Sequence, residues 1–139
     1  MTESLPSAEA FALDVDLSKV REMCRALGLP VPADVDGQVP LTFLTTMRHW
    51  IGPESDAWRL LGFDPKRVLH AGEEYEFHTG PLRIGQRLTG RSRIADRYTK
   101  ANKAGQTLTF AVMETEYHDS SGVHIATARL TGVELPEVE

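Results

Sequence analysis

The chain has little cysteine, no long apolar run and no basic leader. Cys24 is its one cysteine among 139 residues, so no disulfide can form within the chain, which fits a reducing compartment. Residues 1–12 contain Glu3 and Glu9 but no basic cluster, which is not the pattern of a secretory signal peptide. No apolar run approaches the roughly 20 residues of a transmembrane helix. We therefore expect a cytoplasmic protein with no membrane partner.

An excess of basic charge is also missing, because the formal net charge is -5 at pH 7. Nucleic-acid-binding domains usually carry a positive face, so the sequence predicts no nucleic-acid partner. No glycine-rich phosphate loop links a strand to a helix, and we expect no cofactor. Hydrophobic residues make up 41% of the chain, which is enough for one domain over residues 1–139 with a buried core. Residues 1–12 are small and polar and are predicted to be flexible.

Helical patterns are confined to the first half of the chain. Asp16 can cap a first helix, whose apolar residues share one face as far as Leu27, and Gly28 then ends it. A short third helix is expected over residues 55–61, because a glycine follows at Gly62.

The second helical segment differs from these two because it offers little polar surface. It is predicted to begin at Pro40, whose missing N–H would have no partner in a first helical turn, and to run to Trp50. Apolar residues cover much of its circumference, so we expect this helix to be buried.

From residue 68 onward the pattern changes to that of strands. Polar and apolar residues alternate over residues 74–78, 88–94, 107–112 and 123–127. Three long strands joined by short polar turns indicate an antiparallel meander, and about four antiparallel strands are expected in all. Helices followed by strands predict an α+β domain, in which a curled antiparallel sheet wraps around the one apolar helix.

Several segments resemble the MaoC-like dehydratase and hydratase family. Residues 80–88, with the sequence GPLRIGQRL, are similar to a turn between two strands of that family, and further similarity covers residues 39–44, 68–77, 94–100 and 114–117. Within the family, these segments resemble the N-terminal, fatty-acid-synthase-like dehydratase type, which includes mycobacterial (3R)-hydroxyacyl carrier-protein dehydratase subunits. The resemblance covers about the last two-thirds of the chain. It implies a hotdog fold with one buried central helix.

The resemblance also implies an activity in fatty acid metabolism, as an (R)-specific 3-hydroxyacyl thioester dehydratase or enoyl hydratase acting on acyl-CoA or an acyl carrier protein. This chemistry needs a base, a polar group that holds the water, and donors for the thioester oxygen. Family members supply the first two as Asp and His in a D-x-N-P-x-H segment before the central helix. The matching loop here, residues 29–39, holds Asp34 and Asp36 but neither Asn nor His.

This departure leads to one main hypothesis and two alternatives. In the main hypothesis the chain shapes the acyl tunnel of a heterodimer, and a partner hotdog chain supplies the Asp/His pair. The first alternative is a homodimeric hydratase or thioesterase with an altered site, and the second is a non-catalytic acyl-thioester-binding module. The candidate catalytic residues are His70, His49 and Asp36, and the candidate substrate-binding residues are Pro40, Leu41, Thr42, Leu44, Thr45 and Arg83.

Each of these residues also has a structural interpretation, as a satisfied histidine, a turn aspartate or a solvated arginine. A basic group could steer phosphates or an acidic carrier protein; it comprises Arg91, Arg93, Arg97, Lys100 and Lys103. His78, His118 and His124 are interpreted as surface residues. No pair of histidines has metal-ligand spacing with a third ligand, so no metal site is predicted.

Overall fold

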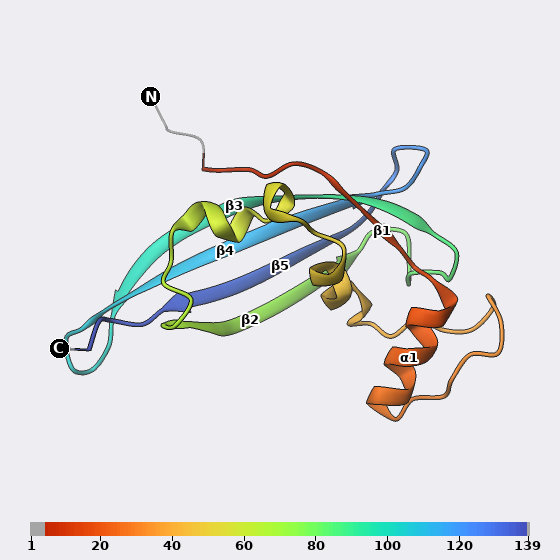
Figure 1. Cartoon of the computed structure of the whole chain (residues 1–139), viewed down its shortest axis with the longest axis horizontal. Helices are drawn as coiled ribbons and strands as arrows, with labels where there is room; N and C mark the ends of the chain where they lie inside the picture. The colour runs from red at the N-terminus through yellow and green to blue at the C-terminus, as the bar shows by residue number, and fades with distance from the viewer. Residues whose placement is uncertain (1–4, 139) are drawn as a thin grey trace.

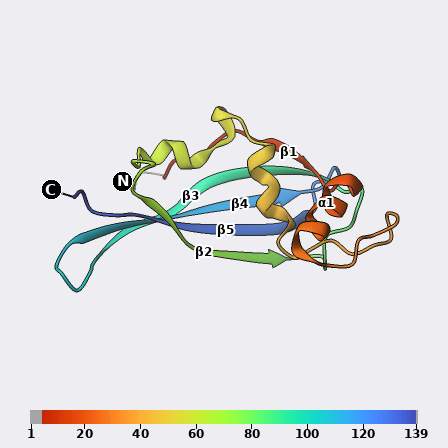
Figure 2. The same ribbon diagram turned by 60° about the horizontal axis from the view of Figure 1, so that its bottom comes forward.

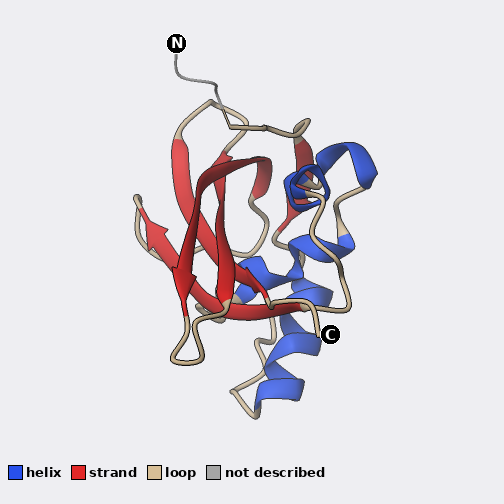
Figure 3. Ribbon diagram, turned by 90° about the vertical axis from the view of Figure 1, so that its left-hand side faces the viewer, coloured by secondary structure: helices blue, strands red, loops and turns tan. Residues whose placement is uncertain are grey.

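Five antiparallel strands form one curled sheet, and helical segments lie on one of its faces (Figures 1 and 3). The computed structural model describes residues 5–138. The strands are β1 (Phe11–Asp14), β2 (Val68–Phe77), β3 (Arg87–Ala101), β4 (Thr107–His118) and β5 (His124–Glu134), in the order β1-β3-β4-β5-β2. This arrangement confirms the predicted α+β class with a curled antiparallel sheet.

The helical layer consists of one α-helix and three short 3₁₀ segments: α1 (Leu17–Leu27), η1 (Phe43–His49), η2 (Pro53–Ser55) and η3 (Ala57–Leu61). Figure 2 shows the three 3₁₀ segments following one another across the same side of the sheet. We call the sheet face that they cover the inner face and the opposite face the outer face. Among residues 5–138, no helix has the length and apolar character needed to cross a membrane.

The long strands β3, β4 and β5 form the predicted meander, in which each pairs with its neighbour in sequence. The alternation on β4 separates the two faces, because Ala111, Met113 and Tyr117 are buried in the core while Glu116 between them is exposed. β2 pairs with β5 and not with β3. Residues 78–86 therefore cross between distant strands of the sheet instead of closing a hairpin.

The first helix confirms the sequence prediction at both ends. The Asp16 side chain accepts hydrogen bonds from the backbone N–H groups of Ser18 and Lys19, at 3.1 and 3.3 Å. The Ser18 hydroxyl also donates to it, and these bonds lower the pKa of the Asp16 carboxyl. Gly28 ends the helix with a φ of 70°, a left-handed conformation that glycine adopts without strain. Val20 and Cys24 form its buried side.

The predicted second helix is shorter than expected and begins later. Pro40 does not start it: the Pro40 carbonyl accepts a bond from the Phe43 N–H, which closes a turn, and η1 begins at Phe43. η1 is a 3₁₀ helix, so residues three apart align in one row, and it buries Phe43, Leu44 and Met47 against the sheet. Leu41 is 67% exposed. Within η1, Thr45 and His49 are exposed, so the central helix is buried on one side and open to solvent on the other.

The N-terminal segment is not free, in contrast to the prediction for residues 1–12. The Pro6 carbonyl accepts a bond from Ile94 N–H at 2.8 Å, and Ala8 N–H donates to the Ser92 carbonyl at 2.9 Å. Ala8 is buried, and β1 continues the pairing along β3. Residues 1–4 lie outside the described residues. The described N-terminal segment thus runs alongside β3 and pairs with the edge of β3 that faces away from β4.

A network of ion pairs joins four strands across the outer face. Arg129 on β5 contacts Glu76 at 2.6 Å and Glu74 at 3.3 Å on β2, and its Nε contacts Glu114 on β4 at 2.9 Å. Arg93 on β3 contacts the other Glu114 oxygen at 2.7 Å. Burial alone would raise the pKa of the Glu114 carboxyl, but the hydrogen bonds from Arg93 and Arg129 outweigh it and lower this pKa.

Loss of charge at the centre of this network is expected to weaken the fold. We predict that Glu114→Gln lowers the free energy of unfolding at neutral pH by roughly 1–3 kcal/mol, because two arginines lose a buried anionic acceptor. The folded pKa lies below the ordinary value of 4.5, so the carboxylate stabilises the fold above that pH, and this contribution is lost as the pH falls from 4.5 toward the folded pKa.

Urea denaturation measured from about pH 3 to about pH 7 tests both parts of this prediction. Glu22→Gln, which removes an exposed carboxylate on α1, is the matched control. Identical pH dependence for the wild type and Glu114→Gln would show that the Glu114 carboxylate contributes nothing.

Close packing at Gly90 gives a second test of the fold. A Cβ at this position of β3 would lie 2.5 Å from the Phe11 ring and 2.9 Å from the Tyr117 ring, two rings that pack edge to face with centroids 5.9 Å apart. We expect Gly90→Ala to lower the free energy of unfolding by roughly 1–3 kcal/mol. Gly72→Ala on β2 meets no atom within 4 Å and should change it by less than about 0.5 kcal/mol. Denaturation curves that shift equally for the two variants contradict this packing.

Candidate functional site

A cavity of about 190 Å³ lies between the helical layer and the inner face of the sheet. Its helical wall comes from η1, η3 and the residues between them, and its floor comes from β2, β4 and β5. Most of the wall is apolar, with contributions from Leu44, Met47, Ile51, Trp58, Met113, Ala128 and Leu130. An enclosed apolar space with a few polar groups at one side is the usual form of a small-molecule site.

Contact between Trp58 and Gly132 fixes one wall of this cavity. Asp56 caps η3 by accepting a 3.0 Å bond from the Trp58 N–H. The Trp58 ring then packs against β5 where Gly132 has no side chain, since a Cβ there would lie 2.2 Å from a ring carbon. The ring also packs edge to face with Phe63, at a centroid distance of 5.8 Å.

Three polar side chains of β2 gather at the solvent side of the cavity. Glu73 accepts a hydrogen bond from the Tyr75 hydroxyl, and its other carboxylate oxygen lies 3.3 Å from His70 Nε2. A β-bulge between His70 and Gly72 makes this possible, because its extra residue places His70 and Glu73 on the same face although they are three positions apart. The His70 side chain is 57% exposed and Glu73 30%. We call these three residues the β2 polar cluster.

The environment keeps the tyrosine of this cluster protonated. Burial, followed by the hydrogen bond to Glu73, raises the pKa of Tyr75 far above its ordinary value of 10. The Tyr117 hydroxyl is buried without a hydrogen-bond partner among the described residues, and burial together with the Glu73 charge raises its pKa as well. Tyr75 is therefore a hydrogen-bond donor at physiological pH, while Glu73 is an acceptor beside a histidine. A carboxylate that orients an imidazole is a common arrangement for a general base.

The candidate residues predicted from sequence divide among three places. His70, Leu44 and Thr45 line the cavity. Pro40, Leu41 and Thr42 line a separate, more open apolar depression of about 520 Å³ beside α1 and Cys24. Asp36 and Arg83 line a third depression, where the Gln38 backbone pairs with that of Arg83.

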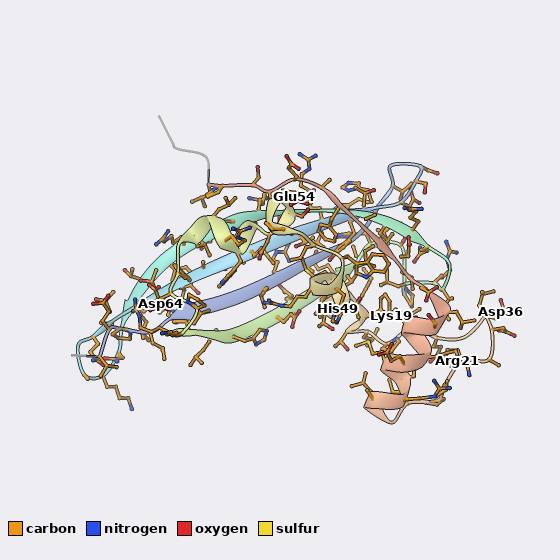
Figure 4. The ribbon with its side chains drawn as sticks, viewed as in Figure 1. Lys19, Arg21, Asp36, His49, Glu54 and Asp64 are labelled. Carbon is orange, nitrogen blue, oxygen red and sulfur yellow. The ribbon has the colours of Figure 1, made fainter. Side chains whose placement is uncertain are left out.

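The two remaining catalytic candidates do not lie beside the cavity residue His70. His49 is on the exposed side of η1 and is not part of the cavity wall. Asp36 is exposed on the loop beyond α1, far from His49 (Figure 4). Asp34 accepts a 2.9 Å bond from the Asp36 N–H, which is the turn chemistry that sequence reasoning set against an acid/base role.

Sequence reasoning did not identify Glu73, Tyr75 or Trp58 as site residues. The alternation of residues 74–78 predicts that Tyr75 points to the buried face. The bulge that places His70 beside Glu73 depends on pairing with β5, which is distant in sequence. The contact of Trp58 with Gly132 likewise depends on tertiary packing.

The predicted basic group is divided by a second bulge. The register of β3 shifts between Ile94 and Asp96, so residues after it change face. Arg93 lies on the outer face with Glu114, whereas Arg97 lies over the Phe63 ring at 5.2 Å beside η3. Arg97 is therefore separated from the basic residues of the outer face.

Two of the histidines interpreted as surface residues gather with a glutamate. One ligand atom from each of Glu116, His118 and His124 lies within 4.8 Å of the others, and both histidines are half-buried. No third ligand was predicted beside these histidines, because Glu116 joins them only through the face that it shares with His118 on β4. Glu116 and His118 are two apart on one strand face, and the hairpin pairs His118 with His124. The sequence does contain a signal for this cluster. Glu116 and His118 are two residues apart before a short turn, and a second histidine, His124, follows the turn.

Comparison with known proteins decides the family. Residues 6–128 match the family described as FAS1-like, dehydratase domain region. The chain belongs to this family. The match confirms the predicted resemblance and extends it into the first third of the chain. A UPF0336 protein from Streptomyces griseus is 28% identical over 128 residues, covering 84% of this chain and 81% of the relative.

Solved structures with similar folds include two complexes from Mycobacterium tuberculosis. A chain of the HadBC (3R-hydroxyacyl-ACP dehydratase) complex aligns with a TM-score of 0.68 and 16% identity, over 96% of this chain and 99% of that chain. A chain of the ChsH1-ChsH2 complex aligns with a TM-score of 0.69 and 15% identity, over 96% of this chain and 86% of that chain. At these identities the similarity concerns the fold, and it confirms the hotdog architecture of this FAS1-like dehydratase domain.

The contact between Trp58 and Gly132 gives a test of the cavity wall. We expect Gly132→Ala to move the Trp58 ring away from β5, because the added Cβ would overlap it. In a Trp50→Phe background, Trp58 is the one remaining tryptophan, and its fluorescence should shift to longer wavelength as the ring gains solvent contact. Gly72→Ala in the same background serves as the control. An unchanged emission maximum in Gly132→Ala refutes the described wall.

Proposed function

We propose that this FAS1-like dehydratase domain is a subunit of an (R)-specific 3-hydroxyacyl thioester dehydratase or enoyl hydratase. In this proposal it lines the acyl-binding site, and a partner hotdog chain supplies the Asp/His pair. The observation that carries the proposal is an apolar cavity under η1 in a family member whose loop before η1 contains no histidine.

The cavity suits the acyl end of a thioester. Its walls are mainly aliphatic and aromatic, so an acyl chain would lose little solvation on entry. Its volume of about 190 Å³ is below that of pockets for drug-sized ligands, which favours a short acyl group. The β2 polar cluster at the solvent side can hydrogen-bond to the polar β-hydroxyl or to water.

The loop before η1 is the reason for assigning the acid/base pair to another chain. Its two acidic residues are exposed, and Asp34 is engaged by the Asp36 backbone in a turn. Neither residue lines the cavity beneath η1. A general base has to lie within hydrogen-bond reach of the proton that it removes, and this loop offers no such group to the cavity.

A free strand edge provides a place for the partner. β2 pairs with β5 on one side, and its other side carries no strand within residues 5–138. The β2 polar cluster lies on this same strand, so a second hotdog sheet joined there would bring its own residues close to the cavity mouth. The related folds in HadBC and ChsH1-ChsH2 occur in complexes, which supports a heterodimer.

The proposal predicts that hydratase activity depends on a partner. The purified chain is expected to hydrate crotonyl thioester no faster than buffer, whereas co-expression with a MaoC-like neighbour that carries D-x-N-P-x-H should give activity. Within that complex, Ala128→Leu should reduce kcat/KM at least about tenfold by filling the cavity floor. Hydration of the CoA and carrier-protein esters is followed by absorbance and by mass spectrometry.

The matched control is a change of similar size away from the cavity, Ala104→Leu in the exposed turn after β3. It should leave kcat/KM unchanged. A complex that forms but in which Ala128→Leu has wild-type kinetics would remove this chain from the acyl site. Full activity of the chain without a partner would point to the alternative below.

The β2 polar cluster favours a second candidate function, a homodimeric hydratase or thioesterase with an altered site. Here His70 acts as the base, Glu73 orients its imidazole across 3.3 Å, and Tyr75 donates a hydrogen bond. This candidate requires activity from the chain alone that His70→Ala abolishes. His49→Ala, which changes an exposed histidine outside the cavity wall, should leave that activity intact.

A further inference from the structure

The outer face of the sheet carries a second cluster of chemically capable side chains, at the end of the β4–β5 hairpin. His118 and His124 are paired across the hairpin, and their rings stack with centroids 4.8 Å apart and an interplanar angle of 16°. Glu116 lies on the same strand face as His118, two residues earlier. One ligand atom from each of the three residues falls within 4.8 Å of the other two.

This cluster is separate from the acyl cavity. Tyr117 and Ala126 are fully buried in the core, and they pair with each other on adjacent strands. Glu116 and Thr127 are the next pair along the same ladder and point to the opposite face. The cluster therefore lies across the sheet from the cavity, and no residue is shared between the two.

We propose that Glu116, His118 and His124 form a binding site for a divalent transition metal ion, with Zn²⁺ as the favoured ion. Two imidazoles and one carboxylate are a ligand set that suits zinc, and three protein ligands leave a fourth position for water. Mg²⁺ and Ca²⁺ prefer sites made of oxygen ligands, so the two imidazoles select against them.

Metal binding requires at least one histidine ring to rotate out of the stack, because the nitrogen lone pairs lie in the ring planes and the two planes are nearly parallel. Zinc–nitrogen and zinc–oxygen bonds of about 2.0–2.2 Å place tetrahedral ligand atoms roughly 3.3–3.6 Å apart, compared with separations of up to 4.8 Å here. Glu116 is exposed, so its carboxylate can approach the two rings. The hairpin already places the two histidines opposite each other on adjacent strands.

A second layer of polar groups already orients one of the ligands. The Thr127 hydroxyl lies 3.0 Å from His124 Nε2 and 2.9 Å from His78 Nε2, and the His78 ring centroid is 4.3 Å from that of His124. Thr127 is buried at 4% exposure. An imidazole has two nitrogens, so His124 keeps one beyond the nitrogen that contacts Thr127. Hydrogen bonds of this kind fix the orientation of metal-binding histidines.

Zinc titration of tag-free, chelator-treated protein tests the proposal. Isothermal titration calorimetry is expected to give one Zn²⁺ per chain, and Co²⁺ in its place should show the visible absorption of a four-coordinate site with nitrogen and oxygen ligands. His118→Ala, His124→Ala and Glu116→Gln should each weaken Zn²⁺ binding by about tenfold or more. MgCl₂ should produce no binding heat.

His70→Ala and His49→Ala are the matched controls, because they remove exposed histidines elsewhere on the chain. Both should bind Zn²⁺ as the wild type does. The proposal is overturned if the wild type takes up no stoichiometric Zn²⁺, if the ligand variants bind as tightly as the wild type, or if His70→Ala is the variant that loses binding. Glu116→Gln changes an exposed side chain and keeps the test valid should a histidine variant fail to fold.

Discussion

Two glycines on the inner face allow close packing, one between the sheet and the helical layer and the other between side chains of neighbouring strands. Trp58 lies against β5 at Gly132, and the Phe11 and Tyr117 rings meet over Gly90 on β3. Protein interiors are packed as densely as organic crystals, so a methyl group at Gly132 would push the helical layer away from β5, and one at Gly90 would displace the rings of Phe11 on β1 and Tyr117 on β4. The cavity under η1 is the part of this interface that the two layers leave unfilled, and its shape therefore depends on these contacts.

Two β-bulges then decide which polar residues reach which face. The bulge on β2 brings His70 to the side of Glu73, at the mouth of the cavity. The bulge on β3 moves Arg97 from the outer face, where Arg93 lies, to the ring of Phe63. A strand without a bulge alternates strictly. At the cavity, the interrupted alternation of β2 is what places the His70 side chain beside Glu73.

Local patterns in the sequence were sufficient for the parts of the fold that depend on local physics. The cap at Asp16, the α1 stripe and the three-strand meander follow from spacing alone. The start of the central helix does not follow from spacing. Proline suits the first turn of a helix, but it is equally compatible with a separate turn, and Pro40 forms such a turn before η1 begins at Phe43. For the site, His70 was identified, but its partner Glu73 was not, because a bulge is set by pairing between β2 and β5.

The N-terminal segment has a consequence for how the domain can assemble. Residues 6–14 run beside β3 and form a short, irregular margin on that side of the sheet. On the other side, the ten residues of β2 pair with β5 and leave their second row of backbone groups unpaired by any strand among residues 5–138. A sheet with two open margins could add copies without limit and grow into a fibre. With one long margin available, edge-to-edge association of the proposed kind would end once a single companion had docked, so growth would be self-terminating.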